Sequence, residues 1–208
     1  MTRRPALGTA RRACVLAVAL ASLFAAVGAA ASGCTRREGD GANGTQVVDV
    51  ELMAFLSEAR ALHHQANLME ASGDLAGAAA AMERLVSARR PHDGKAPEVQ
   101  EVLADAYARL AELRLRQNAL PRAYDAVRAG LEHAPEPTYF RGHLIEIEGL
   151  IEEARAAELA DAGNAEEAAR ARDRAIQLFE QVVKIQDQVI QSSLASRDAG
   201  APPETRGR

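Results

Sequence analysis

The chain has 208 residues, enough for one domain of ordinary size. Hydrophobic residues make up 48% of it and aromatic residues only 3%, and Trp is absent, so a core must be built from Ala, Leu, Val and Ile. The first 33 residues hold four Arg and no acid, so removing them changes the formal net charge from −4 to −8. A surface that acidic repels phosphate backbones and argues against nucleic-acid binding.

Residues 1–33 have the layout of an export signal. Residues 1–12 are basic, and residues 13–31 form a run of apolar and small residues with one Ser. This order is typical of a signal peptide that is removed from the mature protein. A run of about 20 residues could also span a membrane, so an uncleaved anchor is an alternative, as is ordinary secretion. Arg11-Arg12 leaves export by the twin-arginine route open beside the general route.

The end of this segment, Ala31-Ser32-Gly33-Cys34, resembles the lipobox of bacterial lipoproteins. The resemblance implies cleavage before Cys34 and lipidation of its thiol and new N-terminus, with acyl chains such as palmitate. Two or three chains give stable anchoring where one gives only marginal binding. Members of that family more often have Leu where Ala31 stands. Thr35 lies where an Asp tends to hold lipoproteins in the inner membrane, so the resemblance favours the outer membrane.

The two cysteines, Cys14 and Cys34, lie in or at the end of the leader, which excludes a disulfide framework in the mature protein. Residues 34–46 are polar and Gly-rich, so we expect a flexible tether with an end-to-end distance of about 20 Å. A helical domain is predicted over residues 47–194. The tail, residues 195–208, contains Pro202-Pro203 and is predicted to be disordered.

Three helix–turn–helix units are predicted in the helical domain. Turn residues recur every 45 positions, at Gly73, Asn118 and Gly163. Apolar residues at three- and four-residue spacing predict helices over residues 47–71, 74–89, 97–117, 121–133 and 138–162, and a last helix to about residue 193. Few runs of β-branched residues occur, so no sheet is expected. The sequence therefore predicts an all-α fold of stacked antiparallel helical hairpins.

The last helix is predicted to extend far past its repeat. Ala169, Ile176, Val183 and Ile190 are each seven residues apart. This spacing fits a coiled coil with a partner, including a second copy of the chain. It also fits a cap, which we favour, because the end of a stack needs a cover for its open face.

The hairpins resemble tetratricopeptide repeats. The first unit matches the family pattern at Leu62, Ala66, Met69, Gly73, Ala78, Met82, Leu85 and Pro91, and the second matches it at Tyr107, Ala111, Ala123, Val127, Gly130 and Pro135. The third unit is degenerate, because Glu152 and Arg172 stand at positions that are usually apolar. The family's period is 34 residues, whereas these units recur at 45, with the extra residues in connectors and longer first helices. The resemblance implies a tetratricopeptide-like α-solenoid, and an Ala-rich helical bundle remains the alternative.

No catalytic set is present in the sequence. The histidines do not pair with a second ligand at the i, i+4 spacing of a helical zinc site. Acidic residues alternate with Arg along helix faces, as solvated i, i+3 and i, i+4 pairs do. We therefore expect no enzyme, no metal site and no cofactor.

The resemblance also implies a groove, because the first helix of each tetratricopeptide hairpin lines the concave face. It places on this face Arg60, His63, Asn67 and Glu70 from the first unit and Asp105, Ala108, Glu112 and Leu115 from the second. Such a polar, mixed-charge surface suits an extended peptide or a partner helix.

The function expected from these features is a scaffold, lipid-anchored in the bacterial envelope and facing the periplasm. It would join envelope proteins that assemble outer-membrane proteins, pili or secretion machinery. One alternative is a substrate-binding or transport-associated lipoprotein, which needs an enclosed apolar pocket that the low aromatic content disfavours. A second is a structural lipoprotein that self-assembles through its last helix.

Overall fold

The computed structural model describes residues 49–200, and their side chains as far as residue 197. The chain divides into two units, Met1–Gln46 and Val47–Arg208, and the described residues belong to the second. The predicted signal peptide (1–33), Cys34, the tether (34–46) and residues 201–208 of the predicted tail lie outside the described part.

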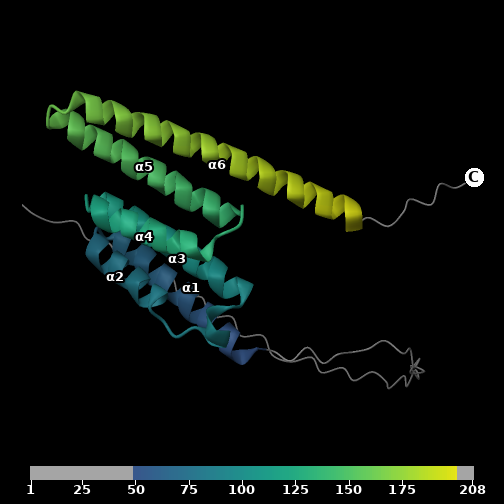
Figure 1. Cartoon of the computed structure of the whole chain (residues 1–208). Coiled ribbons are helices and arrows are strands. Elements are labelled where there is room, and N and C mark those ends of the chain that lie inside the picture. Colours follow the sequence, from purple (N-terminus) through teal and green to yellow (C-terminus); the bar gives the residue numbers. More distant parts are fainter. Residues whose placement is uncertain (1–48, 201–208) are drawn as a thin grey trace, which may run out of the picture. The chain divides into compact units, whose positions relative to one another are not determined.

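The described residues form helices and no strand, which confirms the predicted all-α class. Figure 1 shows that α5 and α6 lie side by side and that α6 continues past the start of α5. Consecutive helices pack in the pairs α1 with α2, α3 with α4 and α5 with α6, and α3 also contacts α1, α2 and α5. The elements are α1 (Val50–Ala71), α2 (Leu75–Val86), the 3₁₀ helix η1 (Pro91–Gly94), α3 (Pro97–Arg116), α4 (Leu120–His133), α5 (Tyr139–Asp161) and α6 (Ala165–Gly200).

The same turn joins the helices of each pair. Gly73, Asn118 and Gly163 all adopt positive φ, at 86°, 57° and 81°. In each turn this residue's N–H donates to the carbonyl three residues earlier, at 2.9–3.0 Å, and the next N–H donates to the carbonyl five residues earlier, at 2.8–2.9 Å. These bonds satisfy carbonyls that a helix end leaves unpaired. The predicted 45-residue recurrence of the turns is therefore confirmed.

Side-chain caps fix where three helices begin. Asp49 accepts a hydrogen bond from the N–H of Leu52 at 3.0 Å, and Asp74, the predicted cap, accepts one from Gly77 at 2.8 Å. Thr138 caps α5 by accepting from Arg141 at 3.2 Å. An oxygen at the N-cap satisfies one of the free N–H groups of the first turn.

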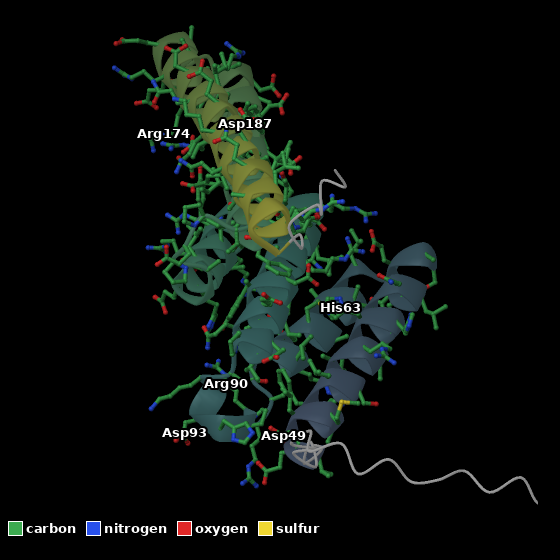
Figure 2. The ribbon with its side chains drawn as sticks, turned by 90° about the vertical axis from the view of Figure 1, so that its right-hand side faces the viewer. Asp49, His63, Arg90, Asp93, Arg174 and Asp187 are labelled. Carbon is green, nitrogen blue, oxygen red and sulfur yellow. The ribbon has the colours of Figure 1, made fainter. Side chains whose placement is uncertain are left out.

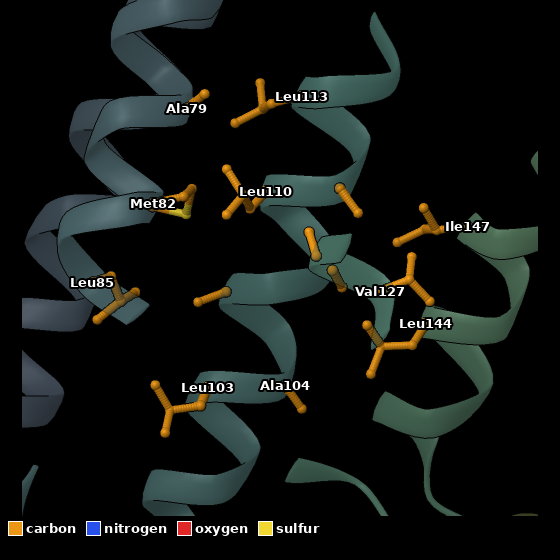
Figure 3. Close-up of a cluster of buried hydrophobic side chains, with 14 of the residues drawn as sticks. Ala79, Met82, Leu85, Leu103, Ala104, Leu110, Leu113, Val127, Leu144 and Ile147 are labelled. Atoms are coloured by element: carbon orange, nitrogen blue, oxygen red, sulfur yellow. The ribbon is translucent and has the colours of Figure 1, made fainter. Parts of the chain in front are cut away.

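One cluster of small and aliphatic side chains runs through α1 to α5. Figure 3 shows Met82 and Leu85 of α2 facing Leu103 and Leu110 of α3, with Val127 of α4 on the other side of α3. Leu144, Ile147 and Ile151 extend the cluster into α5 and are at most 1% exposed. Burying such side chains is the main favourable contribution to folding. The core thus uses the residue types that the composition requires.

Glycines let α5 approach α6 closely. A Cβ added at Gly149 would lie 2.7 Å from Cε1 of Phe179, and one added at Gly142 would lie 2.5 Å from Nε2 of Gln186. At Gly149 three atoms of the aromatic ring block a side chain, whereas at Gly142 the blocking atom is the end of a flexible side chain that can move. Apolar side chains are also buried on both helices, for example Ile145 on α5 and Ile185 on α6.

Two predicted boundaries were wrong. The second helix was expected to reach residue 89 but ends at Val86, where Ser87 caps it and its hydroxyl donates to the carbonyl of Glu83 at 2.7 Å. The tail was expected to be disordered from residue 195, whereas α6 continues to Gly200. Residues 194–199 contain neither Gly nor Pro, so the backbone has no reason to leave the helix before Gly200.

Candidate binding surface

The predicted groove residues come from α1 and α3, and ion pairs connect these helices to each other. On α1 the spacing of His63 and Glu70 places both on one face. Nε2 of His63, labelled in Figure 2, lies 3.6 Å from a carboxylate oxygen of Asp105 on α3. Burial lowers the pKa of His63, although Asp105 opposes this effect. His63 and Asp105 therefore form a weak polar contact rather than a strong ion pair.

Glu70 makes a denser junction about two turns further along α1. Its carboxylate pairs with Arg109 through one oxygen and with Arg116 through the other, so one acid of α1 holds two arginines of α3. The Glu70 side chain is 19% exposed, and those of Arg109 and Arg116 are 26% and 51% exposed. Partial burial weakens screening by water, so this junction should order the surface more than a fully exposed pair would.

The chain of charges continues to α5. Nη1 of Arg109 donates to Glu112 at 2.8 Å, and Glu112 lies 3.4 Å from Nε2 of His143 on α5. The Glu112 carboxylate raises the pKa of His143, and His143 in turn holds the pKa of Glu112 below its usual value. The Tyr139 ring lies 6.1 Å from the His143 ring. Three alternate helices thus share one continuous polar surface, which we call the α1/α3/α5 surface.

Four of the eight predicted groove residues take part in these contacts, namely His63, Glu70, Asp105 and Glu112. Arg60 and Asn67 are exposed on α1 and are accessible to a partner. Leu115 is half-buried and packs against the core. Ala108 corrects the prediction, because it is 1% exposed and belongs to the core cluster, where no partner can touch it.

Sequence reasoning missed Arg109, Arg116 and His143. For the two arginines a signal was present: Asp105, Arg109, Glu112 and Arg116 follow one another at spacings of four, three and four residues, which places alternating charges on one helical face. No comparable pattern marks His143, which joins the surface only because α5 packs against α3.

A second charged cluster lies between α4, α5 and α6, around Glu152. Glu152 is the one charged side chain of the described residues that is fully buried, with 1% exposure. One carboxylate oxygen accepts a hydrogen bond from Arg174 of α6 at 3.3 Å, and the other lies 3.6 Å from Arg155. This acid is therefore buried at the junction of these helices.

Within residues 49–200, no three His, Cys, Asp or Glu side chains come together in a way that could hold a metal ion. In that same range, no helix combines the length and the apolar character that crossing a membrane requires. Comparison with known proteins finds no matching family model, no matching curated protein and no matching solved structure.

Proposed function

We propose that the chain is a bacterial lipoprotein whose helical body scaffolds protein–protein contacts at the envelope. Its helices would form stacked antiparallel hairpins of tetratricopeptide type, capped by α6, and Cys34 would carry the lipid. The order of basic segment, apolar segment and Ala31-Ser32-Gly33-Cys34 supports the anchor. The same turn at Gly73, Asn118 and Gly163 supports the repeat.

The observation that carries the scaffold proposal is the α1/α3/α5 surface. Glu70, Arg109, Glu112 and His143 link one face of three alternate helices through successive ion pairs. Such a surface offers fixed donors and acceptors along its length, which suits an extended peptide or an amphipathic partner helix. The partner would be an envelope protein, and the lipid would keep the scaffold beside the membrane where that protein is assembled.

Lipidation and membrane location are tested by mass spectrometry of the purified wild type and of Cys34→Ser, together with fractionation of membranes. We expect acyl chains on residue 34 of the wild type and recovery in the membrane fraction, the outer membrane in particular. Cys34→Ser should carry no lipid and leave the membrane. An unmodified Cys34 would contradict the anchor.

The surface is tested by pull-down from detergent-solubilised membranes with matched variants. Glu70→Arg reverses the charge that holds Arg109 and Arg116, whereas Glu153→Arg reverses an exposed charge on α5 outside this surface. We expect a protein captured by the wild type and by Glu153→Arg to be lost with Glu70→Arg. Equal capture by all three proteins would contradict the surface.

A second candidate function is self-assembly, favoured by the outer face of α6. Ile176, Val183 and Ile190 are 57–60% exposed and seven residues apart, and Leu194 is 53% exposed. Exposed apolar residues at this spacing are typical of a coiled-coil seam. Sedimentation of the body without its leader, compared with Val183→Ser, should show a concentration-dependent dimer that the substitution removes.

A further inference from the structure

The end of α6 extends past the helix that it packs against. Figure 1 shows α6 continuing beyond the start of α5, and Gln186 of α6 lies beside Gly142, three residues from that start. Residues 190–200 therefore lie beyond α5, over a length of about 15 Å at 1.5 Å per residue. We call this part the α6 overhang. Residues 190–197 are all exposed, so the overhang has no cover among the described residues.

The overhang carries an apolar pair on one face. Ile190 is 58% exposed and Leu194 is 53% exposed, and their four-residue spacing places them side by side on the helix. The outer face of a terminal helix in a stack is usually polar, because nothing in the chain follows to cover it. Apolar side chains in this position therefore indicate a cover from outside the described part of the chain.

Two opposite charges border the apolar pair. Asp187, labelled in Figure 2, lies three residues before Ile190, and Arg197 lies three residues after Leu194. Spacings of three, four and three residues place all four side chains on one face. Neither Asp187 nor Arg197 forms an ion pair among the described residues. They are about 15 Å apart along the helix axis, so they cannot pair with each other within one chain.

This order of charges and apolar residues is complementary to itself in one direction. If two copies run in opposite directions with Ile190 facing Leu194 of the second copy, Asp187 faces Arg197 of the second copy. The two-fold axis repeats each contact, so the interface contains two Ile–Leu contacts and two Asp–Arg pairs. Two copies running in the same direction and in register would instead place each charge against its own kind, which is unfavourable. The chain itself thus supplies the complementary surface.

We propose that the α6 overhangs of two copies pair in opposite directions, through the face from Asp187 to Arg197. The proposal rests on the self-assembly candidate above and specifies where on α6, and in which direction, the second copy binds. A stable interface usually buries about 800 Å² on each partner, more than so short a helix offers. The dimer is therefore expected to be weak in solution.

Sedimentation equilibrium of the body without its leader measures this dimer, with protein concentrations up to about 1 mM because a short interface binds weakly. We expect the wild type to dimerise in a concentration-dependent way. Asp187→Arg and Arg197→Asp should each weaken the dimer by about tenfold, because each places two pairs of like charges in the interface. The double variant exchanges the charges across both pairs and should restore the dissociation constant of the wild type.

Asp173→Arg is the matched control. Asp173 is an exposed acid of the same helix, and it lies 14 residues before Asp187 and outside the proposed overlap. Its reversal changes the net charge as Asp187→Arg does, so it should leave the dimer unchanged. Equal weakening by both variants would mean that net charge, rather than a specific pair, controls association, and would overturn the proposal.

Two further results would overturn the proposal while leaving self-assembly intact. A dimer that is lost with Val183→Ser but unchanged in both Asp187→Arg and Arg197→Asp would place the contact elsewhere on α6. A double variant that stays as weak as the single ones would show that the two charges do not pair across the interface. A wild type that stays monomeric at every concentration would overturn this proposal and the self-assembly candidate together, without bearing on the α1/α3/α5 surface.

Discussion

Helices α1–α4 pack against one another through different side chains from those between α5 and α6. In α1–α4, large buried side chains such as Met82, Leu85 and Leu103 fill the space between helices and are fully covered. On α6, three of the four buried hydrophobic residues among the described ones are alanines, and other side chains of α6 lie close to Gly142 and Gly149 of α5. The outer face of α6 remains apolar and uncovered, with Val183 60% exposed.

The difference is clearest at Glu152, which is buried in α5. The first two units carry apolar residues in their cores, whereas the third unit buries this acid and pairs it with Arg174 of α6. A buried ion pair contributes little net stability and is costly to break. The third unit therefore has a polar junction where the first two units have apolar side chains.

The largest expected effect is in the α1–α4 core. Leu103→Ala should lower the free energy of unfolding by about 2–5 kcal/mol, because it removes a fully buried side chain and leaves a cavity. Val183→Ala, on the exposed face of α6, should change it by less than about 0.5 kcal/mol. Denaturant titrations of both variants measure this. Similar losses in both would mean that the outer face of α6 is covered in solution.

The glycine contact between α5 and α6 should be the next most sensitive. Gly149→Val should destabilise the protein by about 1–3 kcal/mol, because its side chain would meet the Phe179 ring. Ala157→Val places the same side chain at an exposed position of α5 and serves as the control. If the two variants melted alike in thermal unfolding, close approach at Gly149 would not matter.

Substitutions at the Glu152–Arg174 pair should change the free energy of unfolding in different directions, depending on which partner is replaced. Arg174→Ala leaves an oxygen of the buried Glu152 without its donor and should cost about 1 kcal/mol, toward the low end because Arg174 itself is 62% exposed. Glu152→Met removes the buried charge and should be neutral or stabilising. Arg170→Ala is the control: Arg170 lies one turn earlier in an exposed pair with Glu166, and its loss should leave the free energy of unfolding unchanged. Destabilisation by Glu152→Met would contradict this account.

The smallest effect concerns the pH dependence of the Glu112–His143 pair. The raised pKa of His143 stabilises the fold below the ordinary imidazole value of 6.5, and that contribution is lost as the pH rises through the folded pKa. The lowered pKa of Glu112 stabilises the fold above the ordinary carboxyl value of 4.5, and that contribution is lost as the pH falls through its folded pKa. The pair is therefore most stabilising between these two values.

Relative to His143→Gln, the wild type should lose less than about 1 kcal/mol of stability as the pH rises from about 6 to 8. His64→Gln, which changes an exposed histidine of α1, is the control and should follow the wild type. Unfolding curves at a series of pH values measure the difference. A wild type that gained stability over this range relative to His143→Gln would contradict the assigned pair.

The sequence predicted the elements well because its local signals agree with the packing. Gly73, Asn118 and Gly163 are residues that tolerate positive φ, and they stand at the ends of apolar periodic segments. The end of α6 was placed too early because Pro202-Pro203 was taken to mark a longer disordered tail. Residues 194–199 contain neither Gly nor Pro, and α6 continues through them to Gly200.

The candidate sites were less predictable, because they depend on which helices meet. Helical spacing selects the face that contains Glu70 and Glu112, but it cannot distinguish a covered position from an open one, as Ala108 shows. The spacing of charges on α3 could have identified Arg109 and Arg116. The junction at Glu152 could be found only from the tertiary structure, since Glu152 and its donor Arg174 come from different helices.

The central claim is that the α1/α3/α5 surface receives a protein partner, and photocrosslinking in intact cells tests it most directly. A photoreactive amino acid at residue 67, in place of the exposed Asn67 on this surface, is compared with one at residue 153, in place of exposed Glu153 outside it. The account predicts a crosslink to an envelope protein from residue 67 and none from residue 153. A crosslink from residue 153 alone, or from neither position, would contradict it.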